Sequence, residues 1–175
     1  MSTRCQIEFK EISNYLGRKK PIIERRTIYR HSDGYPDGEC GIISDIKKFL
    51  QWDRGFDIEY TPSNFLYWDK VKTIQSLQNN PSCKSKEEKQ EIEDRWSKIG
   101  YGVCENDEFH GDLAYFYELV NEITETEKNC FKIELNLFVY GINKEKTKQG
   151  FLKPTKRENL KLIKTVKIST KTKRY

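Results

Sequence analysis

Apolar side chains at every second position between residues 4 and 10 alternate with polar ones. This period of two predicts a β-strand with one buried face. The next segment, 24–31, is rich in the β-formers Thr27, Ile28 and Tyr29. It predicts a second strand, which we expect to pair with the first and to end at His31. Two Asp-Gly pairs and a proline within residues 33–38 then predict tight turns with positive φ angles.

Helical spacing replaces this alternation after the turn. Apolar residues at positions 42, 43, 46, 49 and 50 predict an amphipathic helix, with Asp37 or Gly38 at its start. A second helix is expected from Pro62 to the Asn-Asn-Pro sequence at residues 79–81. Residues 82–98 are nearly all polar, and Ser85 with Glu88 has the pattern of a capping box. This stretch is expected to be either a charged surface helix or a partly mobile insertion.

The last third of the chain returns to strand patterns, at residues 101–104, 113–120, 131–139 and 160–168. Lysines interleaved with the apolar residues of the last segment are typical of an edge strand. The order of strands, helices and strands predicts an α+β fold with a mixed, mainly antiparallel sheet. We expect five or six strands and two or three helices on one face. A single domain is predicted over residues 1–169, with 82–98 as a charged insertion and 170–175 as a basic tail.

Composition supports a folded domain. Of the 175 residues, 35% are hydrophobic and 13% aromatic, which is too apolar for a disordered chain. No window approaches the apolar length of a membrane span, and the first ten residues lack the apolar run of a signal peptide. We therefore expect a cytoplasmic protein without a membrane segment.

Positive charge is concentrated at the C-terminus. Residues 144–175 contain 12 Lys or Arg against Glu145 and Glu158, a balance of +10 that leaves −5 for the rest of the chain. Such a region attracts a nucleotide, a nucleic acid or an acidic protein through long-range electrostatics. The alternative is a solvated strand and tail with no partner.

The candidate chemistry lies in two His-x-Asp segments, which contain both histidines of the chain. His31 precedes Asp33 by two residues, and His110 precedes Asp112 in the same way. Residues two apart in an extended backbone point to the same side. Two such pairs facing each other would suit a divalent metal, or a general acid and base that flank a phosphate. The alternative is structural, because aspartates beside glycine often cap turns.

Aromatic and cationic residues near these segments extend the predicted ligand site. Arg30, Tyr35 and Tyr115 are expected to join the two His-x-Asp pairs, since tyrosine and arginine stack on bases or anchor protein partners. A half-buried aromatic sheet face is the competing interpretation. The sequence has no phosphate-cradling glycine loop, no Gly-x-Ser-x-Gly elbow, no His-Glu-x-x-His and no EF-hand spacing. Most standard enzyme classes therefore lose support.

Two segments carry a resemblance. Residues 29–36, Tyr-Arg-His-Ser-Asp-Gly-Tyr-Pro, resemble small uncharacterised proteins of bacteria, archaea and their viruses with a Tyr-x-His-x-Asp-Gly-Tyr-Pro segment. Residues 101–115 are similar to a later part of the same proteins. The resemblance implies that the turn and the second His-x-Asp segment are both features of one protein family. It implies no activity. Two-histidine phosphoesterases have Ser or Thr two residues after each histidine, where this chain has Asp33 and Asp112.

Two functional hypotheses follow. The first is a small accessory binding protein of viral or mobile-element origin that binds a nucleotide, nucleic acid or protein partner. The second is a metal-dependent phosphodiesterase or nuclease in which His31, Asp33, His110 and Asp112 hold a divalent metal. Whether the protein is an enzyme at all stays open between them.

Overall fold

Six strands form one sheet in the computed structural model, which describes residues 3–31, 33–39, 41–52, 55–98, 100–143 and 155–174. The strand order is β3-β2-β1-β4-β5-β6, and β1 runs parallel to β4 while every other pair is antiparallel. The predicted α+β class, with a mixed and mainly antiparallel sheet, is therefore confirmed. The elements are β1 (Cys5–Asn14), β2 (Ile22–Arg30), α1 (Ile42–Trp52), α2 (Thr61–Gln78), α3 (Lys86–Lys98), β3 (Tyr101–Cys104), β4 (Tyr115–Glu127), β5 (Cys130–Ile142), the short 3-10 helix η1 (Arg157–Asn159) and β6 (Leu160–Arg174).

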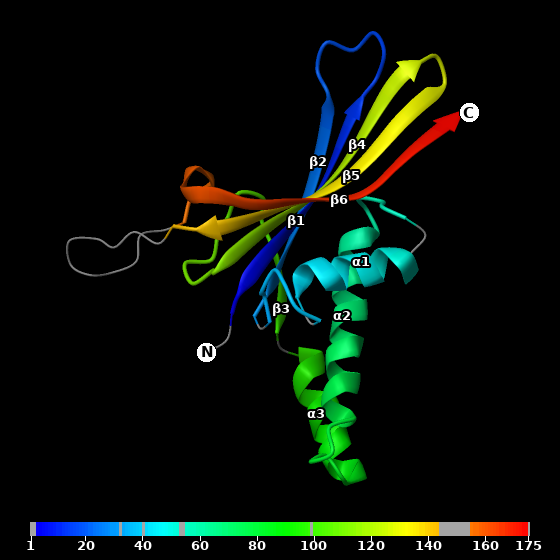
Figure 1. Ribbon diagram of the computed structural model, residues 1–175. Coiled ribbons are helices and arrows are strands. Elements are labelled where there is room, and N and C mark those ends of the chain that lie inside the picture. The colour runs from blue at the N-terminus through cyan, green and yellow to red at the C-terminus, as the bar shows by residue number, and fades with distance from the viewer. Residues whose placement is uncertain are drawn as a thin grey trace, which may run out of the picture.

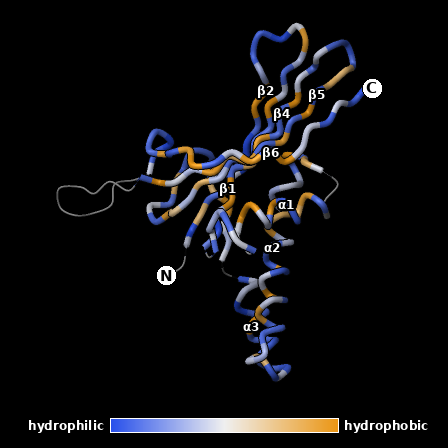
Figure 2. The backbone as a smooth tube through the Cα atoms, viewed as in Figure 1, coloured by the Kyte–Doolittle hydropathy of each residue, from blue (hydrophilic) through white to orange (hydrophobic). Residues whose placement is uncertain are grey.

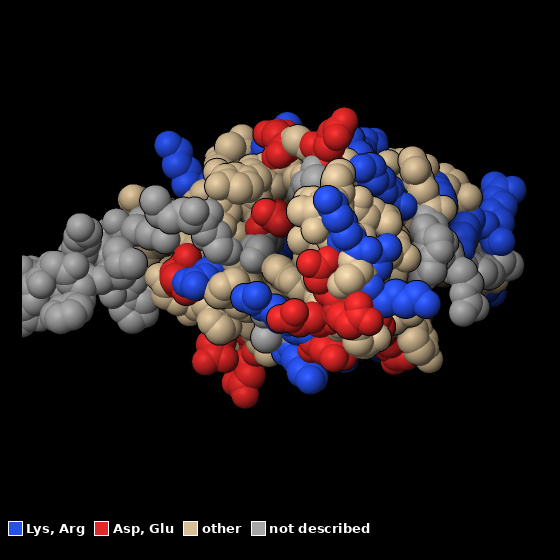
Figure 3. Space-filling model, turned by 90° about the horizontal axis from the view of Figure 1, so that it is seen from below, with Lys and Arg blue, Asp and Glu red and all other residues tan. Residues whose placement is uncertain are grey.

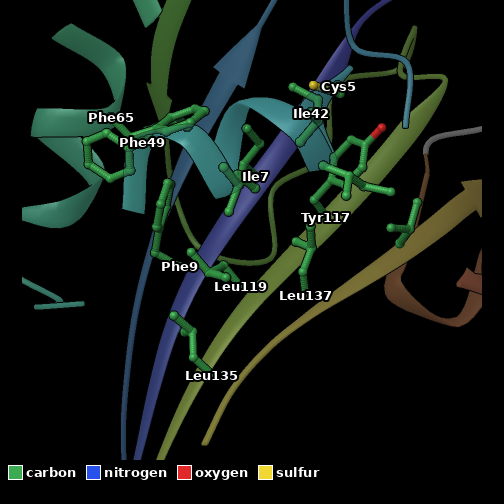
Figure 4. Close-up of a cluster of buried hydrophobic side chains, with 14 of the residues drawn as sticks. Cys5, Ile7, Phe9, Ile42, Phe49, Phe65, Tyr117, Leu119, Leu135 and Leu137 are labelled. Carbon is green, nitrogen blue, oxygen red and sulfur yellow. The ribbon is translucent and has the colours of Figure 1, made fainter. Parts of the chain in front are cut away.

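The core lies between one face of the sheet and the helices α1 and α2 (Figure 1). The alternating apolar residues of β1 point into it, as the sequence pattern predicts. The ring of Phe65 on α2 lies 5.9 Å from that of Phe9 and 5.3 Å from that of Phe49 on α1. These rings meet the aliphatic side chains of β4 and β5 in the packed cluster of Figure 4.

The far half of α2 and the whole of α3 project from the body as a two-helix arm (Figure 1). No residue of α3 is buried, and Figure 2 shows apolar positions concentrated in the strands and α1 rather than in the arm. The predicted capping box is present: Ser85 Oγ accepts from the Glu88 amide at 3.0 Å, and Glu88 Oε2 accepts from the Ser85 amide at 2.9 Å. Residues 86–98 thus form the charged surface helix. Across the described ranges, no helix has both the length and the apolar character needed to cross a membrane.

Several strand ends differ from the prediction: β4 spans Tyr115–Glu127 where 113–120 was expected, and β5 spans Cys130–Ile142 where 131–139 was expected. β2 ends at Arg30, one residue before His31. β6 continues to Arg174, so residues 170–174 belong to a strand and are not the predicted tail. The physical reason is that the first residues of β5 extend the ladder, since Cys130 pairs with Arg174 and Phe131 with Lys173. Tyr175 lies outside the described residues.

The predicted turn after β2 packs tightly against the sheet. Asp33 has a φ of 54°, and the Gly34 amide donates to the Thr3 carbonyl at 2.9 Å. The Gly34 carbonyl accepts a hydrogen bond from the Tyr117 hydroxyl at 2.8 Å. A Cβ at position 34 would lie 2.8 Å from the Cys5 Cβ, closer than real contacts allow. Glycine is therefore required here by close approach to β1.

We expect Gly34→Ala to lower the free energy of unfolding by about 1–3 kcal/mol, because overpacking displaces the turn or β1. Urea denaturation measures this loss. Gly111→Ala is the control, since a Cβ there meets no atom within 4 Å, and its effect should stay within about 0.5 kcal/mol. Equal effects of the two substitutions would contradict the close-packing account.

Candidate functional site

The two histidines meet at the ring of Tyr29. The ring of His110 stacks on it at 4.2 Å and 25°, whereas the ring of His31 lies edge-on at 6.2 Å. The Tyr29 hydroxyl is 3.3 Å from His31 Nδ1. Arg4 forms an ion pair with Asp112 beside this group. Burial, and next the charge of Asp112, raise the pKa of Tyr29. We call these five residues the Tyr29 cluster; both histidine rings lie against Tyr29 in it.

The loop that carries His110 is held over the sheet by a buried glutamine. Gln6 Nε2 donates to the Glu108 carbonyl at 2.8 Å, and Gln6 Oε1 accepts from the His110 amide at 3.2 Å. Gln6 belongs to the face of β1 opposite the helices, and so does Tyr29, its direct partner on β2. This loop therefore covers the open face of the sheet and positions His110 over Tyr29.

The predicted metal set does not form. Asp33 turns away from the histidines and lines a small recess beside Arg30 and Tyr101, because its left-handed backbone redirects the chain after β2. Asp112 is engaged by Arg4. Among the residues described, no three His, Cys, Asp or Glu side chains gather closely enough to hold a metal ion. The donor set expected for a divalent metal is thus dispersed.

The other three predicted ligand residues, Tyr35, Tyr115 and Arg30, lie outside the Tyr29 cluster. Tyr35 is half exposed, and its carbonyl accepts the first amide of α1 at 2.8 Å. Tyr115 faces the helix side beside Tyr117, at a ring distance of 6.3 Å. Arg30 is 3% exposed and points into the core face, so it is a structural residue rather than a ligand contact.

Arg30 belongs to a buried network that we call the Arg30 cluster: Arg30, Asp45, Asp69, Lys72 and Tyr101. Its Nη1 lies 3.1 Å from Asp45 on α1 and 3.3 Å from Asp69 on α2. Lys72 Nζ lies 2.6 Å from Asp45 and 2.9 Å from Asp69. The Tyr101 hydroxyl donates to Asp69 at 2.7 Å. Burial opposes the charge on Arg30, but Asp69 and its neighbours raise the pKa of Arg30 above its usual range. The cluster ties both helices to β2 and β3.

A second network, the Arg157 cluster, lies on the opposite face: Glu8, Asp107, Glu118, Tyr140 and Arg157. Glu8 and Glu118 are register partners on β1 and β4. The Arg157 guanidinium donates to Glu8 at 2.6 Å, to Glu118 at 2.5 Å and to Asp107 at 2.8 Å. Burial raises the pKa of Glu8 more than the Arg157 charge lowers it. Arg157 therefore fastens the segment before β6 onto the sheet and compensates two buried carboxylates.

A groove of about 560 Å³ lies between the α1 side of the molecule and the strands β1, β4, β5 and β6. Its apolar part, which we call the floor, is formed by Leu50, Phe56, Ile123, Ile133, Leu135 and Ile168. Four lysines line it: Lys47, Lys167, Lys171 and Lys173. Four further polar side chains line it: Glu11, Gln51, Asn121 and Ser169. We call this set the lysine groove.

The basic C-terminal region therefore has a concave surface beside it. From the helical end of the molecule, cationic and acidic side chains are intermixed (Figure 3). In the groove, by contrast, Lys47, Lys171 and Lys173 lie with one carboxylate, that of Glu11, while the Lys167 ammonium lies 3.9 Å from Glu134. The sequence indicated the lysines of β6 through their concentration near the C-terminus. It gave no signal for Glu11, Asn121 or Lys47, because only the tertiary fold brings these elements together.

The lysine groove has the volume of small-molecule sites, which span about 300–1,000 Å³, but its lining is more polar than apolar. The Tyr29 cluster contains more ionisable side chains that could take part in a reaction, including both histidines. It lies on the other face of the sheet, at the opposite end of β1 from Glu11.

No family model matches the chain, and searches of curated proteins and of solved structures found no match either.

Proposed function

We propose that this protein binds nucleotide units in the lysine groove, either as free nucleotides or within a single-stranded nucleic acid. The observation that carries the proposal is a groove that combines six apolar side chains with the ammonium groups of Lys47, Lys171 and Lys173. A nucleotide has the complementary construction, since an apolar base with polar edges is joined to an anionic phosphate. Single-strand binding sites elsewhere use the same two parts, a cationic groove and side chains on which bases pack.

The arrangement of the lysines supports a phosphate-bearing ligand. Lys171 and Lys173 line the groove from the same face of β6. Residues two apart on a strand lie about 6.6 Å from each other, so two phosphates of one extended strand can each meet an ammonium group. Lys167 lies 3.9 Å from Glu134, and its charge is therefore partly compensated.

The groove suits a nucleotide better than an acidic peptide. The Glu11 carboxylate would repel the carboxylates of such a peptide, whereas base edges carry N–H donors that a carboxylate accepts. Phe56 supplies an aromatic surface for a base. The metal-dependent phosphodiesterase or nuclease has weaker support, because its four expected ligands are dispersed.

We expect a single-stranded oligodeoxynucleotide of mixed sequence to bind with a strong dependence on salt, and Lys171→Ala/Lys173→Ala to weaken that binding. For single strands, each lost phosphate contact reduces the slope of log K against log salt by about 0.7, so the double variant should lose about 1.4. Fluorescence anisotropy of the labelled oligonucleotide at several salt concentrations measures both quantities. Competition by a mixture of the four deoxynucleoside monophosphates distinguishes the two ligand sources, because a mononucleotide site is emptied by it.

The matched control is Lys86→Ala/Lys89→Ala, which removes the same charge from the exposed surface of α3. Its affinity and salt slope should equal those of the wild type. The proposal fails if the groove variant binds like the wild type, or if the control loses as much affinity as the groove variant.

A further inference from the structure

The lysine groove contains one carboxylate, Glu11. Glu11 and Asn121 are register partners on the parallel strands β1 and β4, and Asn121 Nδ2 donates to Glu11 Oε2 at 3.1 Å. Asn121 is only 4% exposed, so the amide is fixed within the sheet. Within the described part of the chain, the ion pairs of the structure leave Glu11 without a lysine partner. An unpaired carboxylate weakens the attraction of the groove for anionic ligands. This loss is offset only if the ligand donates hydrogen bonds to the carboxylate.

Burial raises the pKa of Glu11, while the hydrogen bond from Asn121 lowers it. Glu24, the register partner of Glu11 on β2, and Asp57 also raise that pKa. The carboxylate is therefore partly buried, with one amide donor and two further carboxylates near it. Such a group gains most from a ligand that donates two hydrogen bonds, since each donor replaces lost water.

The four common bases differ in what they can donate to a carboxylate. Guanine carries N1–H and N2–H side by side, so it can donate to both oxygens at once. Adenine and cytosine each place a ring nitrogen acceptor beside the amino group, and that acceptor repels the second oxygen. Thymine and uracil carry one N–H between two carbonyl groups, which repel the carboxylate on both sides. A carboxylate at the floor of the groove therefore matches guanine alone.

We propose that Glu11 makes the lysine groove selective for guanine, with Asn121 as the positioning residue that orients the carboxylate. The base would lie on the apolar floor, with its Watson–Crick edge toward Glu11 and its phosphate toward the lysines. This inference rests on the proposed nucleotide binding and adds the identity of the base.

The probes are the 5′-monophosphates of guanosine, adenosine, cytidine and uridine, measured by calorimetric titration against the full chain. We expect the wild type to bind GMP about 5- to 100-fold more tightly than the others, the range for one good bidentate base contact. Glu11→Gln should abolish this preference, because an amide offers one donor and one acceptor. The same substitution should strengthen binding of the other three nucleotides, because it removes a negative charge beside the lysines.

A second variant, Glu11→Asp, separates charge from geometry. It keeps the negative charge but withdraws the carboxylate, so the preference for GMP should fall without any gain for the other nucleotides. Circular dichroism confirms that both variants are folded.

The possible outcomes separate this inference from the function on which it rests. Lysine-dependent binding of all four nucleotides with equal affinity would overturn the guanine assignment and leave nucleotide binding intact. A preference for GMP that persists in Glu11→Gln would also overturn the assignment. Failure of every nucleotide to bind would overturn both.

Discussion

Replacing Arg30 with methionine is expected to destabilise the protein by about 3–5 kcal/mol, because it leaves two buried carboxylates with one partly exposed lysine. The Asp45 and Asp69 side chains are 1% and 0% exposed, and Arg30 itself is 4% exposed. The loss would consume a large share of the roughly 5–15 kcal/mol that stabilises a typical domain. Thermal and urea denaturation followed by circular dichroism measure it.

Two further variants show that charge imbalance is the cause of this loss. Arg26→Met changes an exposed arginine on the same strand and should stay within about 0.5 kcal/mol of the wild type. Adding Asp45→Asn and Asp69→Asn to Arg30→Met should recover part of the lost stability, since no buried charge then remains unpaired. Failure of the triple variant to improve on Arg30→Met would contradict the ion-network explanation.

Arg157→Met is expected to cost about 2–4 kcal/mol at neutral pH, somewhat less than a fully buried pair, because Arg157 is 35% exposed. Methionine retains contact with Phe116, over which the guanidinium lies at 5.5 Å. It removes the cation that compensates Glu8 and Glu118. Lys161→Met, on the exposed surface of β6, is the control and should change little.

The effect of Arg157→Met should depend on pH with a definite sign. The pKa of Glu8 is already raised above 4.5 by burial, and loss of Arg157 raises it further. A folded state that binds the proton more tightly than the unfolded state gains stability as pH falls through the folded pKa. The deficit of the variant should therefore be largest at neutral pH and shrink as pH falls toward 4.5. A deficit that grows on acidification would show that Glu8 is not the group left unpaired.

Local sequence patterns predict most of the fold. The alternation of β1, the helical spacing of α1 and the capping box of α3 are set by neighbouring residues, and all three are confirmed. The end of β6 was predicted wrongly because the polar sequence after Ile168 has no apolar alternation. Its strand conformation depends on pairing with β5, a contact that local sequence does not encode.

The candidate site was predicted less completely. Both histidines singled out in the sequence lie against Tyr29, but the stacking of His110 and the Arg4–Asp112 ion pair depend on the loop over the sheet. Glu8 and Glu118 occupy positions that alternation assigns to solvent, and they are buried only because Arg157 and its segment cover them. Glu11 meets Asn121 through the parallel pairing of strands 110 residues apart in sequence. Tertiary contacts of this kind leave no local signature.

The most direct test of the account is to map amide chemical shifts as a single-stranded oligodeoxynucleotide of mixed sequence is added to the full chain. Binding in the lysine groove predicts that the perturbed amides include Glu11, Asn121, Lys171 and Lys173, while those of the Tyr29 cluster stay unchanged. Perturbations confined to Tyr29, His31 and His110 would contradict the account and return the functional site to the two histidines.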